Sequence, residues 1–316
     1  MARRNSCQGG GTTRGKSTKR VRSDTTEQAG ELFPDLEPSK KEKAVPEAEQ
    51  HDEVPDSLRN SGLKQLLKFF IGIALIPPCL ILTASFIQAF SSSVHKGLLA
   101  NQSFGCFAAG LLLFVILFAV VPRKILMLPY VFGHEITHAI WVKIFGGKVA
   151  DQFHVGLEGG HVLTDRVNTW IILSPYFFPI YSVLTATLYG VLAASSRLID
   201  WIHQGSNLAA AVDSFRWVLF LLLGLTMAFH LVFTFLLITK GQPDLHYGGT
   251  FFSLTVIYLI NLLIITALLL STSKPDVWSS YWESLGINSM EFMELCGRAI
   301  AWLLVWIQDL RTGLGR

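Results

Sequence analysis

The sequence predicts an all-α polytopic membrane protein with about six membrane helices and a small β-hairpin. Of its 316 residues, 51% are hydrophobic and 16% are charged, and the mean hydropathy is +0.43. Long uncharged stretches follow a charged N-terminal segment, and a run of about 20 apolar residues is long enough to cross a bilayer as a helix. The six expected membrane helices occupy residues 69–90, 97–122, 125–145, 167–196, 217–239 and 250–270.

Composition divides the chain into three regions. Residues 1–62 are polar, basic at first and then acidic with interspersed Pro, so we expect a disordered charged tail. Residues 63–272 contain the apolar runs and form the expected membrane domain. Residues 273–316 are amphipathic and contain several Trp, which predicts a helix lying in the membrane interface. A membrane-packing or partner-binding helix is the alternative for this last region.

Charge and targeting signals bear on the location of the protein. The net charge of +3 is small and spread out, which argues against nucleic acid as a partner. No apolar signal-peptide core occurs in the first thirty residues, and Lys64 and Lys68 precede the first expected helix. We therefore expect a multi-pass protein of the cytoplasmic (inner) membrane, with its N-terminus in the cytoplasm.

The motif His134-Glu135-Ile136-Thr137-His138 lies within the third expected helix. Residues four apart lie on nearly the same face of a helix, a spacing that suits two imidazole ligands of one Zn²⁺ ion. Glu135 would lie beside the metal, where its carboxylate could take a proton from zinc-bound water. Ionisable groups inside an apolar run are costly unless something pairs them, which favours a metal site over a helix whose polar side chains merely bond neighbours.

The stretch after this helix breaks the helical pattern. Alternating residues from 153 to 158, followed by Gly159-Gly160, predict two short strands around a Gly-Gly turn over residues 149–163. Such a hairpin could hold an extended substrate by β-augmentation, or could be an ordinary surface hairpin. His154 and His161 are candidate metal ligands or proton donors there, with plain loop residues as the alternative.

The fourth expected helix contains Pro175 and Pro179. Proline has no backbone N–H and breaks the hydrogen-bond ladder of a helix, which leaves carbonyls without their helical partners. This irregular stretch could line a cavity, or it could form a kink that packing accommodates.

A hydrolytic zinc site needs a third protein ligand and an open position for water. Asp244, on a turn between the fifth and sixth expected helices, is the first choice and His246 is the competing one. Asp244 would also suit the cap of the following helix. Glu158 and Glu283 are the candidates if the third ligand is a Glu. For His230, inside the fifth helix, we favour contact with a metal ligand or with a backbone carbonyl over direct ligation.

Over about residues 126–270, the chain resembles the site-2 protease family of intramembrane zinc metalloproteases. The resemblance rests on the segment Phe132-Gly133-His134-Glu135-Ile136-Thr137-His138-Ala139, on the proline-bearing span after it and on Gln242-Pro243-Asp244. Gln242 stands where the family commonly has Asn, and Leu245 replaces the Gly after the Asp. Every loop is too short for a PDZ-like insertion, so the chain would be a compact, divergent member.

The resemblance implies that His134, His138 and Asp244 bind Zn²⁺ and that Glu135 is the general base. The expected function is hydrolysis of peptide bonds in or near the transmembrane segments of membrane proteins, so the expected partners are a membrane-protein substrate and the lipid bilayer. A membrane zinc protease of another family, with a Glu as third ligand, is one alternative. A non-catalytic membrane metal-binding or scaffold protein is the other.

Overall fold

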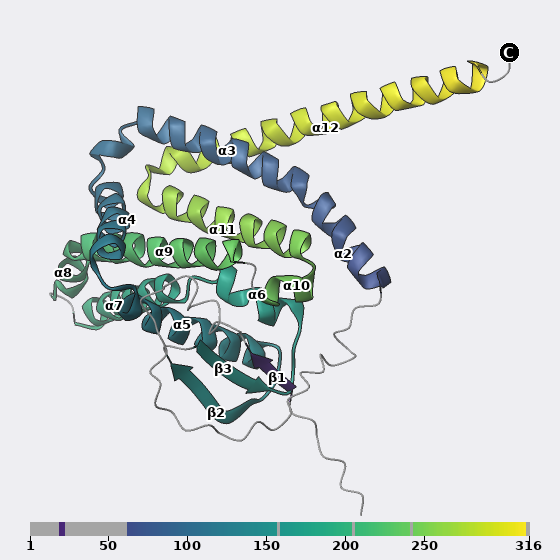
Figure 1. The fold of residues 1–316 in the computed structure, drawn as a ribbon. Coiled ribbons are helices and arrows are strands. Elements are labelled where there is room, and N and C mark those ends of the chain that lie inside the picture. Colours follow the sequence, from purple (N-terminus) through teal and green to yellow (C-terminus); the bar gives the residue numbers. More distant parts are fainter. Residues whose placement is uncertain (1–18, 23–61, 157–158, 204–205, 241–242, 314–316) are drawn as a thin grey trace, which may run out of the picture.

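The computed structural model describes residues 19–22, 62–156, 159–203, 206–240 and 243–313 (Figure 1). Helices predominate in this part of the chain, and a small sheet lies beside α5. The helices are α2 (Gly62–Ala74), α3 (Ile76–His95), the 3-10 turn η1 (Leu98–Ala100), α4 (Gln102–Val120), α5 (Arg123–Ile144), α6 (Thr169–Phe177), α7 (Ile180–Ile202), α8 (Leu208–Ser214), α9 (Arg216–Thr239), α10 (Pro243–Gly248), α11 (Thr250–Thr272) and α12 (Pro275–Gly313). The strands are β1 (Lys19–Arg22), β2 (Val149–Gly156) and β3 (Gly159–Thr164).

Five helical segments in the described residues are long and apolar enough to cross a membrane by length and composition. They are Gly62–His95, which joins α2 and α3, and the helices α4, α7, α9 and α11. This content of apolar helices fits the expected polytopic membrane protein. The third expected span, α5, is not among the five, because His134, Glu135 and His138 lower the hydropathy of an otherwise apolar helix.

Prolines set where two of the expected spans break. Pro77 and Pro78 occupy the first turn of α3, where a missing N–H costs no helical hydrogen bond. The fourth expected span is interrupted at Phe178 and Pro179, which separate α6 from α7. The result is a short, almost fully buried helix, α6, followed by a membrane-length helix, α7.

The sheet has the strand order β1-β3-β2, and both pairings are antiparallel. Its register pairs Phe153 with Val162 and Gly156 with Gly159, with an irregularity between Val149 and Phe153. Gly159 therefore begins β3 instead of forming the turn, and the connecting residues 157–158 lie outside the described part of the chain. β1 comes from the expected tail of residues 1–62, most of which also lies outside the described residues.

The main hydrophobic core lies where α5, α6, α9, α10 and α11 meet. Its members include Tyr130 and Val131 from α5, Tyr176 from α6, Phe233 from α9 and Leu245 from α10. Because α6 and α10 are short, they are held chiefly by this packing. The polar side chains of His134, Glu135 and His138 on α5 are buried in the same part of the molecule.

α12 is a single 39-residue helix that covers most of the expected C-terminal region 273–316. At its start, Lys96 of the preceding α3–η1 connection forms an ion pair with Asp276 at 3.0 Å, and this contact lowers the pKa of the Asp276 carboxyl. Val277 and Tyr281 pack against Ala89 of α3. Further along, the helix projects beyond the rest of the molecule, and its apolar residues 300–307 are exposed (Figure 1). Its placement in a membrane interface stays a prediction.

Two glycines allow α4 and α9 to cross with their backbones in contact. A Cβ on Gly110 of α4 would lie 2.0 Å from the carbonyl oxygen of Leu221, and a Cβ on Gly224 of α9 would lie 2.0 Å from that of Phe107. Small residues at such crossings let membrane helices approach closely enough for extensive van der Waals contact. Neither backbone oxygen can be moved without separating the two helices.

We expect Gly110→Ala to lower the free energy of unfolding by about 1–3 kcal/mol, because the added methyl group overpacks the crossing. The matched control is Gly105→Ala in the same helix, where a Cβ meets nothing within 4 Å. There, the better helix propensity of Ala should leave stability unchanged or raise it by up to about 1 kcal/mol. The midpoint of thermal unfolding in detergent measures the stability of both variants. Equal midpoints would contradict the close backbone contact between α4 and α9 at Gly110.

Candidate metal centre

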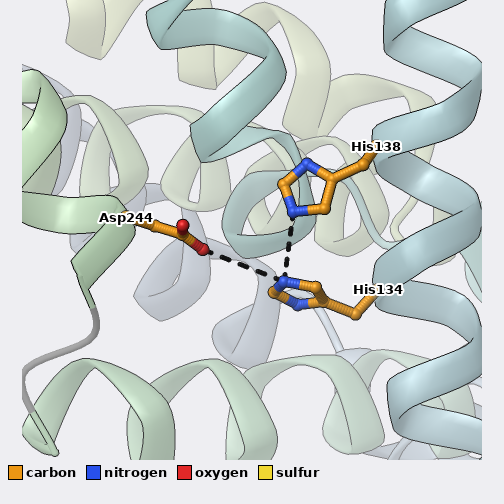
Figure 2. A group of neighbouring side chains, drawn as sticks. All are labelled: His134, His138 and Asp244. Atoms are coloured by element: carbon orange, nitrogen blue, oxygen red, sulfur yellow. Dashed lines mark hydrogen bonds and ion pairs between the residues drawn. The ribbon is translucent and has the colours of Figure 1, made fainter. Parts of the chain in front are cut away.

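The two His residues of the motif lie on the buried face of α5. The helix places them one turn apart, and their Nε2 atoms are 3.2 Å from each other (Figure 2). Both side chains are buried, with exposed fractions of 3% for His134 and 1% for His138. α5 ends just beyond them, where Gly146 takes a left-handed φ of +69° that suits a glycine. The sequence-predicted pairing of the two imidazoles is therefore present.

Asp244 arrives from the opposite side, on α10 (Figure 2). Its Oδ2 atom lies 3.9 Å from His134 Nε2, and one ligand atom from each of Asp244, His134 and His138 lies within 4.8 Å of the others. The turn between α10 and α11 depends on Gly249, whose φ of +82° is strained for other residues. Asp244 is itself only 2% exposed.

These separations suit one small cation. A tetrahedral site with bonds of about 2.0–2.1 Å places its ligand atoms about 3.3–3.4 Å apart. The observed separations are 3.2 Å between the imidazole nitrogens and 3.9 Å between His134 Nε2 and the Asp244 carboxylate. Two imidazole nitrogens and one carboxylate oxygen are also a donor set that zinc accepts. The three side chains therefore form a possible metal site.

The outer ring nitrogen of each His has a partner. His138 Nδ1 donates to the carbonyl oxygen of Ile171 at 2.8 Å, since a carbonyl can only accept. In the neutral ring, Nε2 of His138 then presents its lone pair to the centre, as metal-binding imidazoles do. His134 Nδ1 lies 3.1 Å from the hydroxyl of Tyr130, one turn earlier on α5. When His134 Nδ1 donates to the Tyr130 hydroxyl, Nε2 of His134 likewise presents its lone pair to the centre.

The Ile171 carbonyl is available because of Pro175. In an α-helix this oxygen would accept from the N–H four residues later, and that residue is proline, which has none. Ser174 Oγ donates to the oxygen at 2.8 Å, and His138 supplies the other hydrogen bond. The irregular, proline-bearing stretch thus orients a candidate ligand, a role that neither sequence interpretation named.

Tyr176 contacts the candidate ligands from α6. Its hydroxyl donates to Asp244 Oδ2 at 3.0 Å, and its ring meets that of His134 edge to face, with centroids 5.6 Å apart. Neither Tyr176 nor Tyr130 was among the residues singled out from the sequence. The position of Tyr130, four residues before His134 on one helix, is a signal that could have found it. No comparable local signal links Tyr176 to Asp244.

Glu135 lies in the same buried space but outside the group of candidate ligands. Its side chain is 1% exposed, as deeply buried as that of His138. Two buried carboxylates in an apolar protein are costly unless a positive charge or strong hydrogen bonds compensate them. A divalent cation between the imidazoles and Asp244 would supply that charge.

A narrow cleft opens beside His134 between α5, the α6–α7 connection and α9. Its walls include Thr137, Phe178, Tyr181, Phe229 and His230, and it has room for about 20 Å³. That space is enough for roughly one water molecule. The ring of Tyr181 covers Gly133, where a Cβ would lie 2.8 Å from it, so a larger residue at this position would force the ring to move.

The structure separates the remaining candidates from the three clustered side chains. His246 is exposed and its Nδ1 lies 3.0 Å from Thr250 Oγ1. His230 lines the cleft, with its Nε2 3.2 Å from Asn261 Oδ1, and Glu283 is exposed on α12. The side chains of His154 and His161, and residue Glu158, lie outside the described part of the structure.

We expect purified wild-type protein to bind Zn²⁺ in equimolar amount, and Asp244→Asn and Asp244→Ala to bind much less. The Asn side chain has the same shape and keeps an oxygen that accepts from Tyr176, but it lacks the negative charge. Zinc loss in this variant would therefore report the missing charged ligand and not a packing defect. His246→Ala and Glu283→Ala are the controls and should retain wild-type metal content. Elemental analysis of the protein in detergent gives the result. Zinc loss in either control, with full zinc in the Asp244 variants, would exclude Asp244 as the third ligand.

Comparison of the chain with models of protein families, with curated proteins and with solved structures gives no match.

Proposed function

We propose that the protein is an intramembrane zinc metalloprotease, similar to the site-2 protease family, that hydrolyses peptide bonds in or near transmembrane segments. The observation that carries the proposal is the convergence of His134, His138 and Asp244 at ligand-like separations, beside a buried Glu135. Ionisable groups within membrane helices are expensive, and this cost argues for a functional role.

His134, His138 and Asp244 would hold the Zn²⁺ ion. Bound zinc polarises a carbonyl group and lowers the pKa of a coordinated water toward neutrality. Tyr130 and the Ile171 carbonyl orient the two imidazoles, and Tyr176 orients the carboxylate. The small cleft beside His134 would leave room for one water molecule near the bound ion.

Glu135 would act as general base. Its carboxylate accepts a proton as water adds to the scissile carbonyl carbon, and that proton then passes to the amine nitrogen when the C–N bond breaks. The products are a carboxylate and an amine. Burial serves this step because it excludes bulk water from the carboxylate and strengthens electrostatic interactions around it.

The substrate class follows from the depth of the site. Thr226, Phe229 and His230 line the cleft and lie near the middle of α9, one of the membrane-length helices. A substrate segment would have to unwind there, because a helical backbone hides its carbonyls in internal hydrogen bonds. β2, at the edge of the described sheet and next to α5, offers a strand to which an unwound segment could add.

Two alternatives lead to different measurements. A zinc protease with a Glu as third ligand would need Glu158 or Glu283, and Glu283 is exposed on α12. A non-catalytic metal-binding protein would keep the metal site but no turnover. Glu135, placed beside the ligands and not among them, favours the enzyme over this second alternative.

We expect Glu135→Gln to retain bound zinc and to lower cleavage of a co-expressed single-span membrane reporter by about 10²–10⁴-fold, the usual contribution of a general base. His134→Ala should lose both zinc and cleavage. Reporter fragments are followed by immunoblotting, and zinc by elemental analysis of the purified variants.

Glu283→Gln provides the matched control, because it makes the same chemical change at an exposed position. It should cleave like the wild type. If the Glu135→Gln variant cleaved the reporter normally, Glu135 would not be the general base. Equimolar zinc without cleavage of any membrane reporter by the wild type would favour the non-catalytic alternative.

A further inference from the structure

A buried amide lies near the middle of the membrane-length helix α11. Asn261 is 7% exposed, and its Nδ2 donates to the carbonyl oxygens of Tyr176 and Ile257, each at 2.9 Å. Because Nδ2 has two hydrogens and both are used on carbonyls, the orientation of the amide is determined. Its Oδ1 atom is therefore an acceptor, and His230 Nε2 donates to it at 3.2 Å.

The contact with Tyr176 depends on the break between α6 and α7. α6 ends at Phe177, and Phe178 is extended, so the carbonyl of Tyr176 lies in the last turn, where a helix leaves acceptors without helical partners. Asn261 donates to this oxygen from α11. The amide thus fixes the backbone of α6 at the residue whose side chain reaches Asp244.

From Tyr176 the chain of hydrogen bonds continues to the candidate metal site. The side chain is fully buried, at 0% exposure, and its hydroxyl donates to the same Asp244 oxygen that faces His134. Asp244 sits on α10, a helix of six residues. So short a helix has little stability of its own, and its orientation must come from such tertiary contacts.

We propose that Tyr176 and Asn261 are positioning residues of the metal centre: Asn261 fixes Tyr176, and Tyr176 holds the Asp244 carboxylate toward His134 and His138. His230 completes the series by orienting the amide of Asn261. The inference rests on the proposed function, since it concerns the same metal site. Asn261 and His230, two buried polar residues inside the membrane-length helices α11 and α9, thereby gain a role at the metal centre.

The test is the dissociation constant for Zn²⁺, measured on the full-length protein in detergent by competition with a chromophoric chelator. Loss of a group that orients a metal ligand typically weakens metal affinity 10–100-fold. We expect a loss in this range for Tyr176→Phe, which removes one oxygen, and for Asn261→Leu. The control Thr266→Val removes a buried hydroxyl five residues further along α11, which donates to the Leu262 carbonyl of its own helix, and should leave the dissociation constant unchanged.

The double variant tests the order of the contacts. If Asn261 acts through Tyr176, the loss in the Tyr176→Phe, Asn261→Leu protein is smaller than the product of the two single losses. The visible absorption of Co²⁺ bound in place of zinc should also change in both single variants, because it reports coordination geometry. Independent, multiplicative losses would overturn the proposed coupling.

Further outcomes separate this inference from the proposed function. Zinc bound equally tightly by wild type, Tyr176→Phe and Asn261→Leu, with identical Co²⁺ spectra, overturns the inference alone. Failure of the wild type to bind zinc overturns both. If Asn261→Leu is not recovered folded, His230→Leu replaces it, with a smaller loss of affinity expected. An unchanged constant in both Tyr176→Phe and His230→Leu then contradicts the proposal.

Discussion

The burial of two carboxylates among apolar helices is the constraint on which the rest of the structure depends. Glu135 and Asp244 are 1% and 2% exposed, and uncompensated charges at such positions would cost more than a protein of this size can supply. At Asp244, the hydroxyl of Tyr176 donates to Oδ2 at 3.0 Å, and Nε2 of His134 lies 3.9 Å from the same oxygen. A bound divalent cation, as we propose, would complete the compensation, so metal binding and the stability of this region would be linked.

Broken helices are what make this arrangement possible. Pro175 has no N–H to donate to the Ile171 carbonyl, and the Tyr176 carbonyl has no helical donor because α6 ends at the next residue. The first oxygen accepts from His138 and the second from Asn261. Irregular backbone at membrane depth is tolerated when it is buried in protein and its polar groups are satisfied. Here both freed oxygens receive side chains that belong to, or lead to, the candidate metal site.

The same packing shapes access to the centre. The cleft beside His134 has room for about one water, so an extended peptide could enter only if the walls formed by Tyr181 and Phe229 moved. The two rings meet edge to face with centroids 5.5 Å apart, and Tyr181 also donates to the carbonyl of Pro129. In the proposed protease, substrate entry would therefore require the rings of Tyr181 and Phe229 to move out of the cleft.

The sequence by itself determined the features that depend on local spacing: the apolar helices, and the adjacent His134 and His138, which helical geometry places on one face. It did not determine which residue of α10 faces inward. Asp244 and His246 are two positions apart and thus point about 200° away from each other. Docking of α10 against α6 decided between them, and it brought Asp244 to Tyr176, 68 residues away. Such contacts depend on how helices pack, which no local pattern encodes.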